Sequence, residues 1–556
     1  MFSLINGYIR DMKREFSGYG AAAFGQDALA GTTVAAVALP LALAFGVGSG
    51  ADAASGLISA IVSAFVIGGL SGASFQISGP TGAMTAILIP LSIRFGFSGV
   101  LAAGFVSGIL LILAGLCRAG RLVNLIPAPV ITGFTSGIAV IIALGQLEPL
   151  LGVKSEGAET LKRVYNIFAQ GFHPNLYATA VGAAVILILL LWPKKWASWV
   201  PGSLVGIVFG AAACSALGLP VAMVGDIPRT LVHDSRLTAE ALAGALSQPI
   251  LVAGTSIAAL GMVESLLCGI AGGRMKGEKF DVDRELVAQG LGNVLLPFLG
   301  GVPATAAIAR SSVAIKSGCR TRLTGLTQGA VLLLSMFLLG PFMSKIPLAA
   351  LAGVLMVTAW RMNEWNSIKY IFGRKFRWGE AKYLITLGAT VVFDLTIAIA
   401  AGVFFAVAAF VTKVASIEVT VSEIDPTRLR GKTGPIRHTQ VIYVTGPMFF
   451  AAMARFEAAI HAAEAEVLIF SMRGVPYIDT SGAQMLWDFC REKQKEGISV
   501  LFSALQPRVK EILAQAGIAE LVGGDSFFGN ALDAIEAAGA KGTSQAQGAS
   551  EAAGRS

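Results

Sequence analysis

The chain matches itself without a gap when it is shifted by 223 residues. Residues 30–37 then align with residues 253–260, and the same shift places Pro80 on Pro303. Apolar segments that are interrupted by Gly and Pro at corresponding positions of two halves are the best sequence indication of a transporter's binding site. Because both segments share one register, the match predicts an internal repeat.

The composition places most of this repeat in lipid. The chain is 54% hydrophobic and 14% charged, whereas a soluble protein carries roughly 25% charged residues. Apolar stretches of about 17–25 residues, the length that a membrane-spanning helix needs, recur from Ala28 to about Val411. We predict fourteen spans, which start near Ala28, Ala54, Thr81, Gly99, Pro129, Tyr177, Gly202, Pro249, Leu286, Thr305, Leu326, Pro347, Ala381 and Leu395.

The basic residues orient these spans. With the N-terminus in the cytoplasm and the spans alternating, most basic loop residues fall inside, as the positive-inside rule requires. Each half holds seven spans, and because seven is odd the halves have opposite topology, so the repeat is inverted. We expect a multi-pass protein of the bacterial cytoplasmic (inner) membrane with both termini in the cytoplasm. The net charge of +8 then reflects topology, so membrane lipid and no nucleic acid is the expected partner.

The composition changes after Lys413. Short strand-like apolar runs alternate with amphipathic helical segments between residues 441 and 515, and this pattern predicts a small α/β domain. The last residues are rich in Gly, Ser, Gln and Ala, which predicts disorder. We therefore expect a transmembrane transport domain at 1–415, an α/β domain at 416–540 and a disordered tail at 541–556.

The two aligned prolines predict a binding site for an anion. Pro80 and Pro303 each follow an extended-looking stretch, and we expect each to stand in the first turn of a helix, where proline is tolerated. If both helices begin in the middle of the membrane, the inverted topology lets their N-termini face each other. Two positive dipole ends then converge on one point and suit a small anion. The alternative is a pair of ordinary proline kinks.

Two charged residues stand near this point in apolar surroundings. Arg310 follows Thr305 by five residues, about 7–8 Å along a helix, and an arginine at membrane depth usually has a functional or paired role. Glu264 is the one charge between residues 254 and 270, and the repeat places it on Leu41. A carboxylate in this position can carry a proton or help to hold Na⁺. The alternative is that Arg310 snorkels or forms a permanent structural pair with Glu264.

A third motif lies in the α/β domain. The sequence Pro-Tyr-Ile-Asp-Thr-Ser-Gly ends at Gly482, after a strand-like run and before a helical segment. Asp479 or Ser481 therefore suits the N-cap of that helix. Capping alone explains the motif as well as any regulatory role does.

In combination, the two proline motifs, Glu264, Arg310 and the Asp-Thr-Ser-Gly turn resemble the SulP anion transporter family. The resemblance implies two inverted seven-helix repeats that form core and gate domains, a cytoplasmic STAS domain, a homodimer, and an elevator-like movement of the core. Substrate in this family lies between the third and tenth helices. The residues here that correspond to its substrate-contacting positions are Thr81, Gly82, Ala83, Thr305, Ala306, Ala307 and Arg310.

The same resemblance leaves the coupling ion open. The chain has Leu41 after Pro40 where many relatives have Gln, which is similar to a cyanobacterial bicarbonate branch that is Na⁺-coupled and has Asp in its eighth helix. Here that place holds Glu264, as in relatives thought to be proton-coupled, and Cys268 stands where a hydroxyl would help to bind Na⁺. The turn around Ser481 resembles the phosphorylatable turn of anti-sigma-factor antagonists, so phosphorylation of Ser481 is a hypothesis.

We therefore predict a secondary-active symporter, and not an enzyme, for a small anion such as bicarbonate, sulfate or a dicarboxylate. Five cysteines without a CxxC pair and four histidines argue against a metal site, so no cofactor is expected beyond H⁺ or Na⁺ as coupling ion, with any Na⁺ near Glu264. A cytoplasmic regulator of the STAS domain is a further expected partner. The alternatives are an anion channel or exchanger, a sensor that gates the STAS domain, and a nucleobase symporter of the same fold, against which Arg310 argues.

Overall fold

A computed structural model describes most of the chain. The described residues are 2–121, 127–153, 155, 160–169, 172–197, 200–393, short pieces between 401 and 415, 417–424, 438–460, 463 and 465–538. The chain divides into two compact units, residues 1–404 and 405–556, and each is considered by itself. The domain boundary at 415 stays a prediction, and the tail at 541–556 lies outside the described residues.

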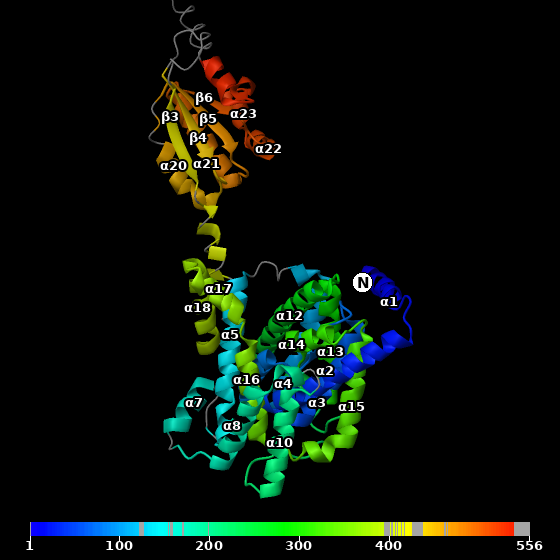
Figure 1. Ribbon diagram of the computed structural model, residues 1–556. Coiled ribbons are helices and arrows are strands. Elements are labelled where there is room, and N and C mark those ends of the chain that lie inside the picture. Colours follow the sequence, from blue (N-terminus) through cyan, green and yellow to red (C-terminus); the bar gives the residue numbers. More distant parts are fainter. Residues whose placement is uncertain are drawn as a thin grey trace, which may run out of the picture. The chain divides into compact units, whose positions relative to one another are not determined.

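The first unit is a bundle of helices with two very short strands (Figure 1). In chain order its elements are α1 (Phe2–Glu15), α2 (Ala21–Gly48), α3 (Ala53–Leu70), β1 (Ser78–Gly79), α4 (Gly82–Leu116), α5 (Ala128–Gly145), α6 (Leu147–Leu151), α7 (Thr160–Ala169), α8 (Leu176–Leu191), α9 (Lys194–Ala197), α10 (Gly202–Leu217), α11 (Ala239–Ala245), α12 (Gln248–Lys276), α13 (Val282–Leu299), β2 (Thr305–Ala306), α14 (Ile308–Lys316), α15 (Leu323–Met343), α16 (Leu348–Met362), α17 (Trp365–Gly373) and α18 (Arg377–Val392).

Most predicted spans coincide with these helices. Each predicted start from Ala28 to Ala381 lies inside a helix or within three residues of one. The start near Leu395 lies outside the described residues. Within the described chain, six helices are long and apolar enough to cross a membrane by themselves, and α8 and α10 are shorter apolar helices. α4 contains two predicted spans, those that start near Thr81 and Gly99. They are separated by a kink at Gly96, whose φ of +68° is not helical.

Glycine lets the helices of this unit pack backbone against backbone. A Cβ on Gly56 of α3 would overlap the carbonyl oxygen of Ala42 in α2. A Cβ on Gly108 of α4 would lie 2.6 Å from the backbone nitrogen of Val294 in α13. Small residues that allow such close approach are typical of helix contacts in membranes, where van der Waals packing drives association. The 66 glycines of the chain therefore serve packing as well as turns.

The two halves of the repeat meet through β1 and β2. These strands pair antiparallel, with Ser78 opposite Ala306 and Gly79 opposite Thr305. The backbone N–H of Ala307 extends the pairing by donating to the carbonyl of Ile77 at 2.9 Å. The segments around the two aligned prolines belong to repeats of opposite topology and therefore run in opposite directions, so the antiparallel pairing agrees with an inverted repeat.

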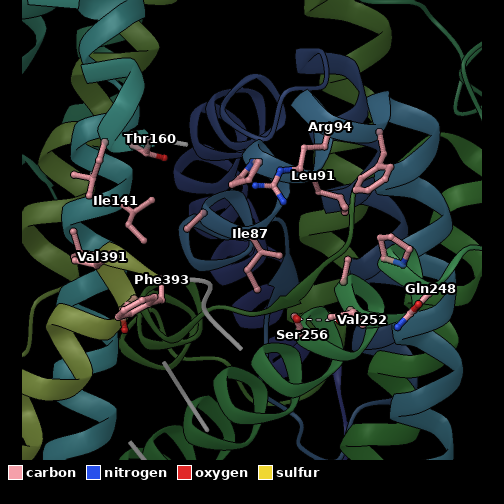
Figure 2. A pocket seen from close by; sticks show the side chains of 18 residues that line it. Ile87, Leu91, Arg94, Ile141, Thr160, Gln248, Val252, Ser256, Val391 and Phe393 are labelled. Atoms are coloured by element: carbon pink, nitrogen blue, oxygen red, sulfur yellow. Dashed lines mark hydrogen bonds between the residues drawn. The ribbon is translucent and has the colours of Figure 1, made fainter. Parts of the chain in front are cut away.

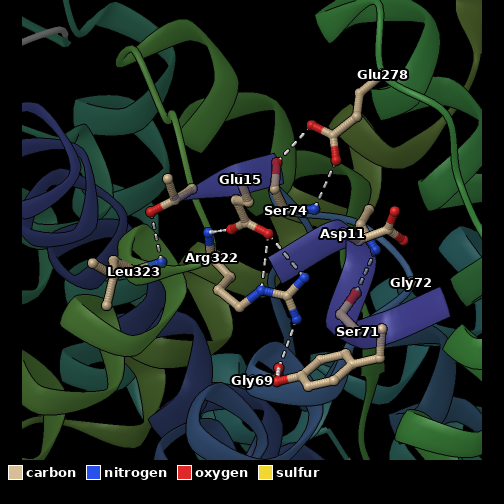
Figure 3. Close-up of polar contacts among 12 residues, drawn as sticks. Asp11, Glu15, Gly69, Ser71, Gly72, Ser74, Glu278, Arg322 and Leu323 are labelled. Carbon is tan, nitrogen blue, oxygen red and sulfur yellow. Dashed lines mark hydrogen bonds and ion pairs between the residues drawn. The ribbon is translucent and has the colours of Figure 1, made fainter. Parts of the chain in front are cut away.

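Helix α1 joins the two halves at another point (Figure 3). Glu15 forms an ion pair with Arg322 at 2.9 Å, and the Arg322 guanidinium donates to the carbonyl of Gly69 at 2.7 Å. The hydroxyl of Tyr8 donates to the same carbonyl at 3.0 Å. Gly69 belongs to the first half and Arg322 to the second, so α1 stabilises their contact.

The second unit contains a five-stranded sheet with the order β3-β4-β5-β6-β7. β3 pairs antiparallel with β4, and all later neighbours are parallel. Its core includes the stacked rings of Phe470 and Phe502, with centroids 5.5 Å apart. The elements are β3 (Glu418–Glu423), β4 (Thr439–Thr445), η3 (Phe450–Ala452), α20 (Met453–Ile460), β5 (Val467–Gly474), α21 (Thr480–Lys495), β6 (Ser499–Ser503), α22 (Pro507–Gln515), α23 (Ile518–Val522), η4 (Gly524–Ser526) and β7 (Phe527–Phe528).

Candidate functional site

The prediction that both prolines stand in the first helical turn is wrong. Thr81 is the N-cap of α4, so Pro80 lies before the helix. Ala307 is the N-cap of α14, so Pro303 lies further upstream, in the stretch that leads into β2. The short strand comes before the proline in the first half and after it in the second. The second helix therefore begins later than the repeat register implies, because residues 304–307 are used for pairing between the halves.

Both helix starts still present backbone N–H groups. At α4 the Thr81 hydroxyl accepts from the Met84 N–H at 3.4 Å, but the N–H groups of Gly82 and Ala83 have no hydrogen-bond acceptor among the described residues. At α14 the N-cap makes no side-chain hydrogen bond, and within the described chain the N–H groups of residues 308–310 are also free. Four orphan N–H groups are normal for a helix start. Unpaired N–H groups at a helix start favour negative charge, so the two starts are a candidate site for an anion.

The predicted contact residues of the second half are placed differently from those of the first. Thr305 and Ala306 lie in β2 and are buried. The Thr305 and Ser265 hydroxyls are 2.8 Å apart, and the Ala306 N–H donates to the Ser265 hydroxyl at 3.3 Å. The N–H of Ala307 is bonded to Ile77. The free amides of this half therefore begin at Ile308, which is 44% exposed.

Arg310 lies in the first turn of α14 and bridges the two halves. Its side chain is 1% exposed, and Nη2 donates to the carbonyl of Pro80 at 2.9 Å. Nη1 has no hydrogen-bond partner. A Cβ on Gly79 would lie 2.6 Å from Nη1, and the φ of Gly79 is +156°, so glycine at this position makes room for the guanidinium. A buried cationic donor without a partner is an unfavourable arrangement unless something binds it.

Glu264 does not pair with Arg310. Among the described residues the ion pairs do not include these two side chains. Instead, Oε2 of Glu264 accepts from the Thr81 hydroxyl at 3.0 Å. Thr81 is the N-cap of α4, so the carboxylate is connected directly to one of the two helix starts. The structural-pair alternative for Arg310 is therefore not what the structure contains.

Cys268 lies one turn beyond Glu264 on α12 and is buried. Its thiol donates to the Ser311 hydroxyl at 3.3 Å, and the same hydroxyl accepts from the Ile77 N–H at 3.0 Å. Cys268 therefore supports the β1–α14 junction. Among the described residues no group of three His, Cys, Asp or Glu side chains is placed to hold a metal ion.

Sequence reasoning missed Asn293, which fixes the segment before β2. Its side chain is 0% exposed, donates to the carbonyl of Ala304 at 2.9 Å and accepts from the N–H of Ala304 at 2.8 Å. Gln289, one turn earlier on α13, donates to the Ser78 hydroxyl at 2.8 Å. A polar pair four residues apart lies on one helix face, and in an apolar span that spacing is a signal for an interior contact.

In the second unit, Asp479 is the residue that caps α21. Its Oδ1 accepts from the Gly482 N–H at 2.9 Å, and Oδ2 accepts from the Phe450 N–H at 3.1 Å. Ser481 is partly exposed in the first turn and lines a hollow of about 430 Å³ between α20 and α21. Phosphorylation of Ser481 stays a prediction.

Comparison with known proteins identifies both units. Residues 24–377 match the sulfate permease family and residues 433–534 match the STAS domain. YvdB of Bacillus subtilis (strain 168) is 32% identical over 92% of this chain and 97% of its own length. The bicarbonate transporter BicA of a Picosynechococcus species is 29% identical over 83% of this chain and 85% of its own length.

Solved structures agree with this identification. The transmembrane domain of a cyanobacterial bicarbonate transporter BicA has a TM-score of 0.62 and 28% identity, covering 68% of this chain and 98% of that chain. Murine Slc26a9, described as an anion transporter in the inward-facing state, has a TM-score of 0.80 with 16% identity, covering 93% and 91% of the two chains; this is a likeness of fold. The predicted polytopic helical domain with a STAS domain is confirmed, while the count of fourteen spans stays a prediction. The chain therefore belongs to the sulfate permease family, SulP, a family of membrane transporters.

Proposed function

We propose that this anion transporter is a secondary-active symporter that binds a small anion between the starts of α4 and α14. The observation that carries the proposal is the unpartnered Nη1 of Arg310, buried beside Pro80. The free N–H groups of Gly82 and Ala83, and those at the start of α14, supply further donors. Binding an anion there would give an acceptor to donors that have no partner within the described chain.

Bicarbonate, sulfate and C4-dicarboxylates are the candidate substrates. The family name and the BicA relatives support the first two. Backbone N–H groups and one guanidinium recognise charge and oxygen acceptors, and all three anions present these. A nucleobase symporter is the rival within transport; the guanidinium of Arg310 favours an anion, and labelled uracil uptake that persists in Arg310→Ala would reverse this choice.

We propose that Glu264 carries the coupling ion, either H⁺ or Na⁺. Its carboxylate accepts from Thr81, the N-cap of α4, so a change in its charge acts on the same helix start that binds the anion. The carboxylate and the Thr81 hydroxyl offer oxygen atoms of the kind that hard cations prefer. The thiol of Cys268 is already bonded to Ser311 and is a soft ligand, so any Na⁺ would rely on oxygen atoms.

The remaining parts of the proposal follow from the family. The core moves as an elevator against the gate, the protein forms a homodimer in the bacterial inner membrane, and both termini lie in the cytoplasm. A cytoplasmic regulator would act on the STAS domain, and Ser481 would be the residue of this domain that is phosphorylated.

Uptake by purified protein in proteoliposomes tests the function. Labelled bicarbonate, sulfate and succinate are offered separately under an imposed Na⁺ gradient and an imposed pH gradient. A symporter accumulates one of them above its equilibrium distribution under one gradient. Flux that stops at equilibrium under both gradients would refute the symporter and favour a channel or an exchanger, and the absence of any flux would favour a sensor.

A further inference from the structure

A cavity of about 590 Å³ opens beside the first half of α4 (Figure 2). α4 and α12 contribute one wall, and α5, α7 and α18 contribute the other. The labelled side chains of Ile87, Ile141, Val252 and Phe393 make this interior largely apolar. Among the described residues that line the cavity there is one cation, Arg94, and no carboxylate.

The cavity leads toward the proposed anion site. Its lining includes Ala86, four residues beyond Gly82 on α4, which is about 6 Å along a helix. Ile142, the neighbour of the lining residue Ile141, lies against Gly82 together with Phe45. In this conformation the cavity therefore stops about one helical turn short of the free α4 amides, behind apolar side chains.

At the end of the cavity away from the proposed anion site, the lining carries positive charge. Arg94 is exposed, and among the described residues no acidic side chain pairs with it. Gln248 and Pro249, also in the lining, form the first turn of α12, whose N-cap Ser247 makes no side-chain hydrogen bond. The positive end of a 29-residue helix thus adds to the charge of Arg94. Apolar walls of low dielectric focus such a field.

We propose that this cavity is the outer entrance of the transport path and that Arg94 draws anions into it. The inference rests on the proposed function. Arg94 follows Gly82 by twelve residues, about 18 Å along a helix, which is too far for its side chain to contact an anion bound at the start of α4. Arg94 therefore acts on the entry of the anion and not on its bound state.

Uptake kinetics at two salt concentrations test this role. In Arg94→Gln, we expect uptake below KM to fall by roughly 3–10-fold at about 10 mM salt, where the Debye length is about 30 Å. The loss should shrink to less than about twofold near 1 M salt, and the maximal rate should stay unchanged. Arg94→Lys should keep wild-type uptake. Arg229→Gln is the matched control, because Arg229 is an exposed cation outside the lining.

Three results would overturn the proposal: wild-type uptake by Arg94→Gln at low salt, an equal loss in Arg229→Gln, or a loss that persists at high salt.

A second measurement needs no transport. In a chain with Cys117→Ser and Val252→Cys, a negatively charged and a positively charged thiol reagent of equal size compete for position 252, an exposed residue of the lining.

Adding Arg94→Gln should lower the ratio of the two modification rates, anionic over cationic, by roughly 3–10-fold. An unchanged ratio means that Arg94 does not set the potential of the cavity. If the ratio falls but no variant or wild type transports any anion, the proposed function fails and the entrance role fails with it. If wild type transports and the ratio is unchanged, only the inference about Arg94 fails.

Discussion

Replacing Arg310 by methionine separates a binding role from a structural one. In the anion-free protein the change removes one hydrogen bond to Pro80, and hydrogen bonds to charged groups contribute roughly 1.5–3 kcal/mol. It also removes a buried charge without an ion pair and an unpartnered donor, which together cost several kcal/mol. The two effects have opposite signs, so Arg310→Met should leave the stability of the anion-free protein unchanged or raise it.

With the anion bound, Arg310→Met should instead make the protein less stable than wild type. Loss of one charge-assisted contact of about 1.5–3 kcal/mol weakens binding by roughly 10–150-fold. At an anion concentration of 100 Kd, the wild-type protein gains about 2.7 kcal/mol from the ligand. A variant that binds 100-fold more weakly gains only about 0.4 kcal/mol at the same concentration. Thermal unfolding of the protein in lipid nanodiscs, with and without the transported anion, measures both quantities.

Arg322→Met is the matched control. Arg322 is as buried as Arg310, but it pairs with Glu15 and bonds Gly69. Removing it leaves a carboxylate without its partner, which costs about 3–5 kcal/mol, and it should leave the stabilisation by the anion intact. The reasoning is refuted if Arg310→Met behaves in the same way, with a large loss of stability and an unchanged response to the anion.

Three further predictions use the same protein. Glu264→Gln should abolish gradient-driven accumulation while sparing anion binding, because an amide cannot exchange a proton or neutralise Na⁺; accumulation equal to that of wild type removes Glu264 from the mechanism. Gly79→Ala should abolish uptake and lower the melting temperature, because its Cβ would lie 2.6 Å from Nη1 of Arg310 at a φ that side chains rarely adopt; a melting temperature equal to that of wild type contradicts the packing. Burial raises the pKa of Glu278, but hydrogen bonds from Ser74 and the positive charge of Lys276 outweigh this effect and leave the pKa below its ordinary value. The stabilisation by ionised Glu278 is present above the pKa of about 4.3 in the unfolded chain and is lost as pH falls through the lower pKa in the folded protein. Ser74→Ala removes part of this stabilisation, so the free energy of unfolding should fall less between pH 6 and pH 3 than it does in wild type.

The sequence was sufficient to predict the helical transport domain, because hydropathy and positive charge act span by span. Glycine and proline positions also located the segment where the halves meet. The exact helix starts were not predictable in the same way. β1 and β2 are two residues each, and their pairing depends on contacts between residues more than two hundred positions apart. This tertiary pairing shifted α14 and moved Arg310 into its first turn.

The polar contacts that position the site were also not predicted from the sequence. Asn293 and Ser265 act through backbone groups of Ala304 and Ala306, and a backbone partner leaves no mark in the sequence. Glu264 was recognised by its charge, but its partner Thr81 was expected to contact the substrate and not Glu264. Residues with a charge were therefore easier to predict than residues that position the chain.

Protection of a cysteine at position 309 tests the central claim most directly. Ala309 is exposed beside the free amides of α14, and the exposed native cysteine Cys117 can be replaced by serine. In Ala309→Cys, the transported anion should slow modification by a thiol reagent, with a concentration dependence that matches its KM for uptake. The same protection should vanish when Arg310→Met is added. A modification rate that is unchanged by saturating anion would contradict binding between α4 and α14.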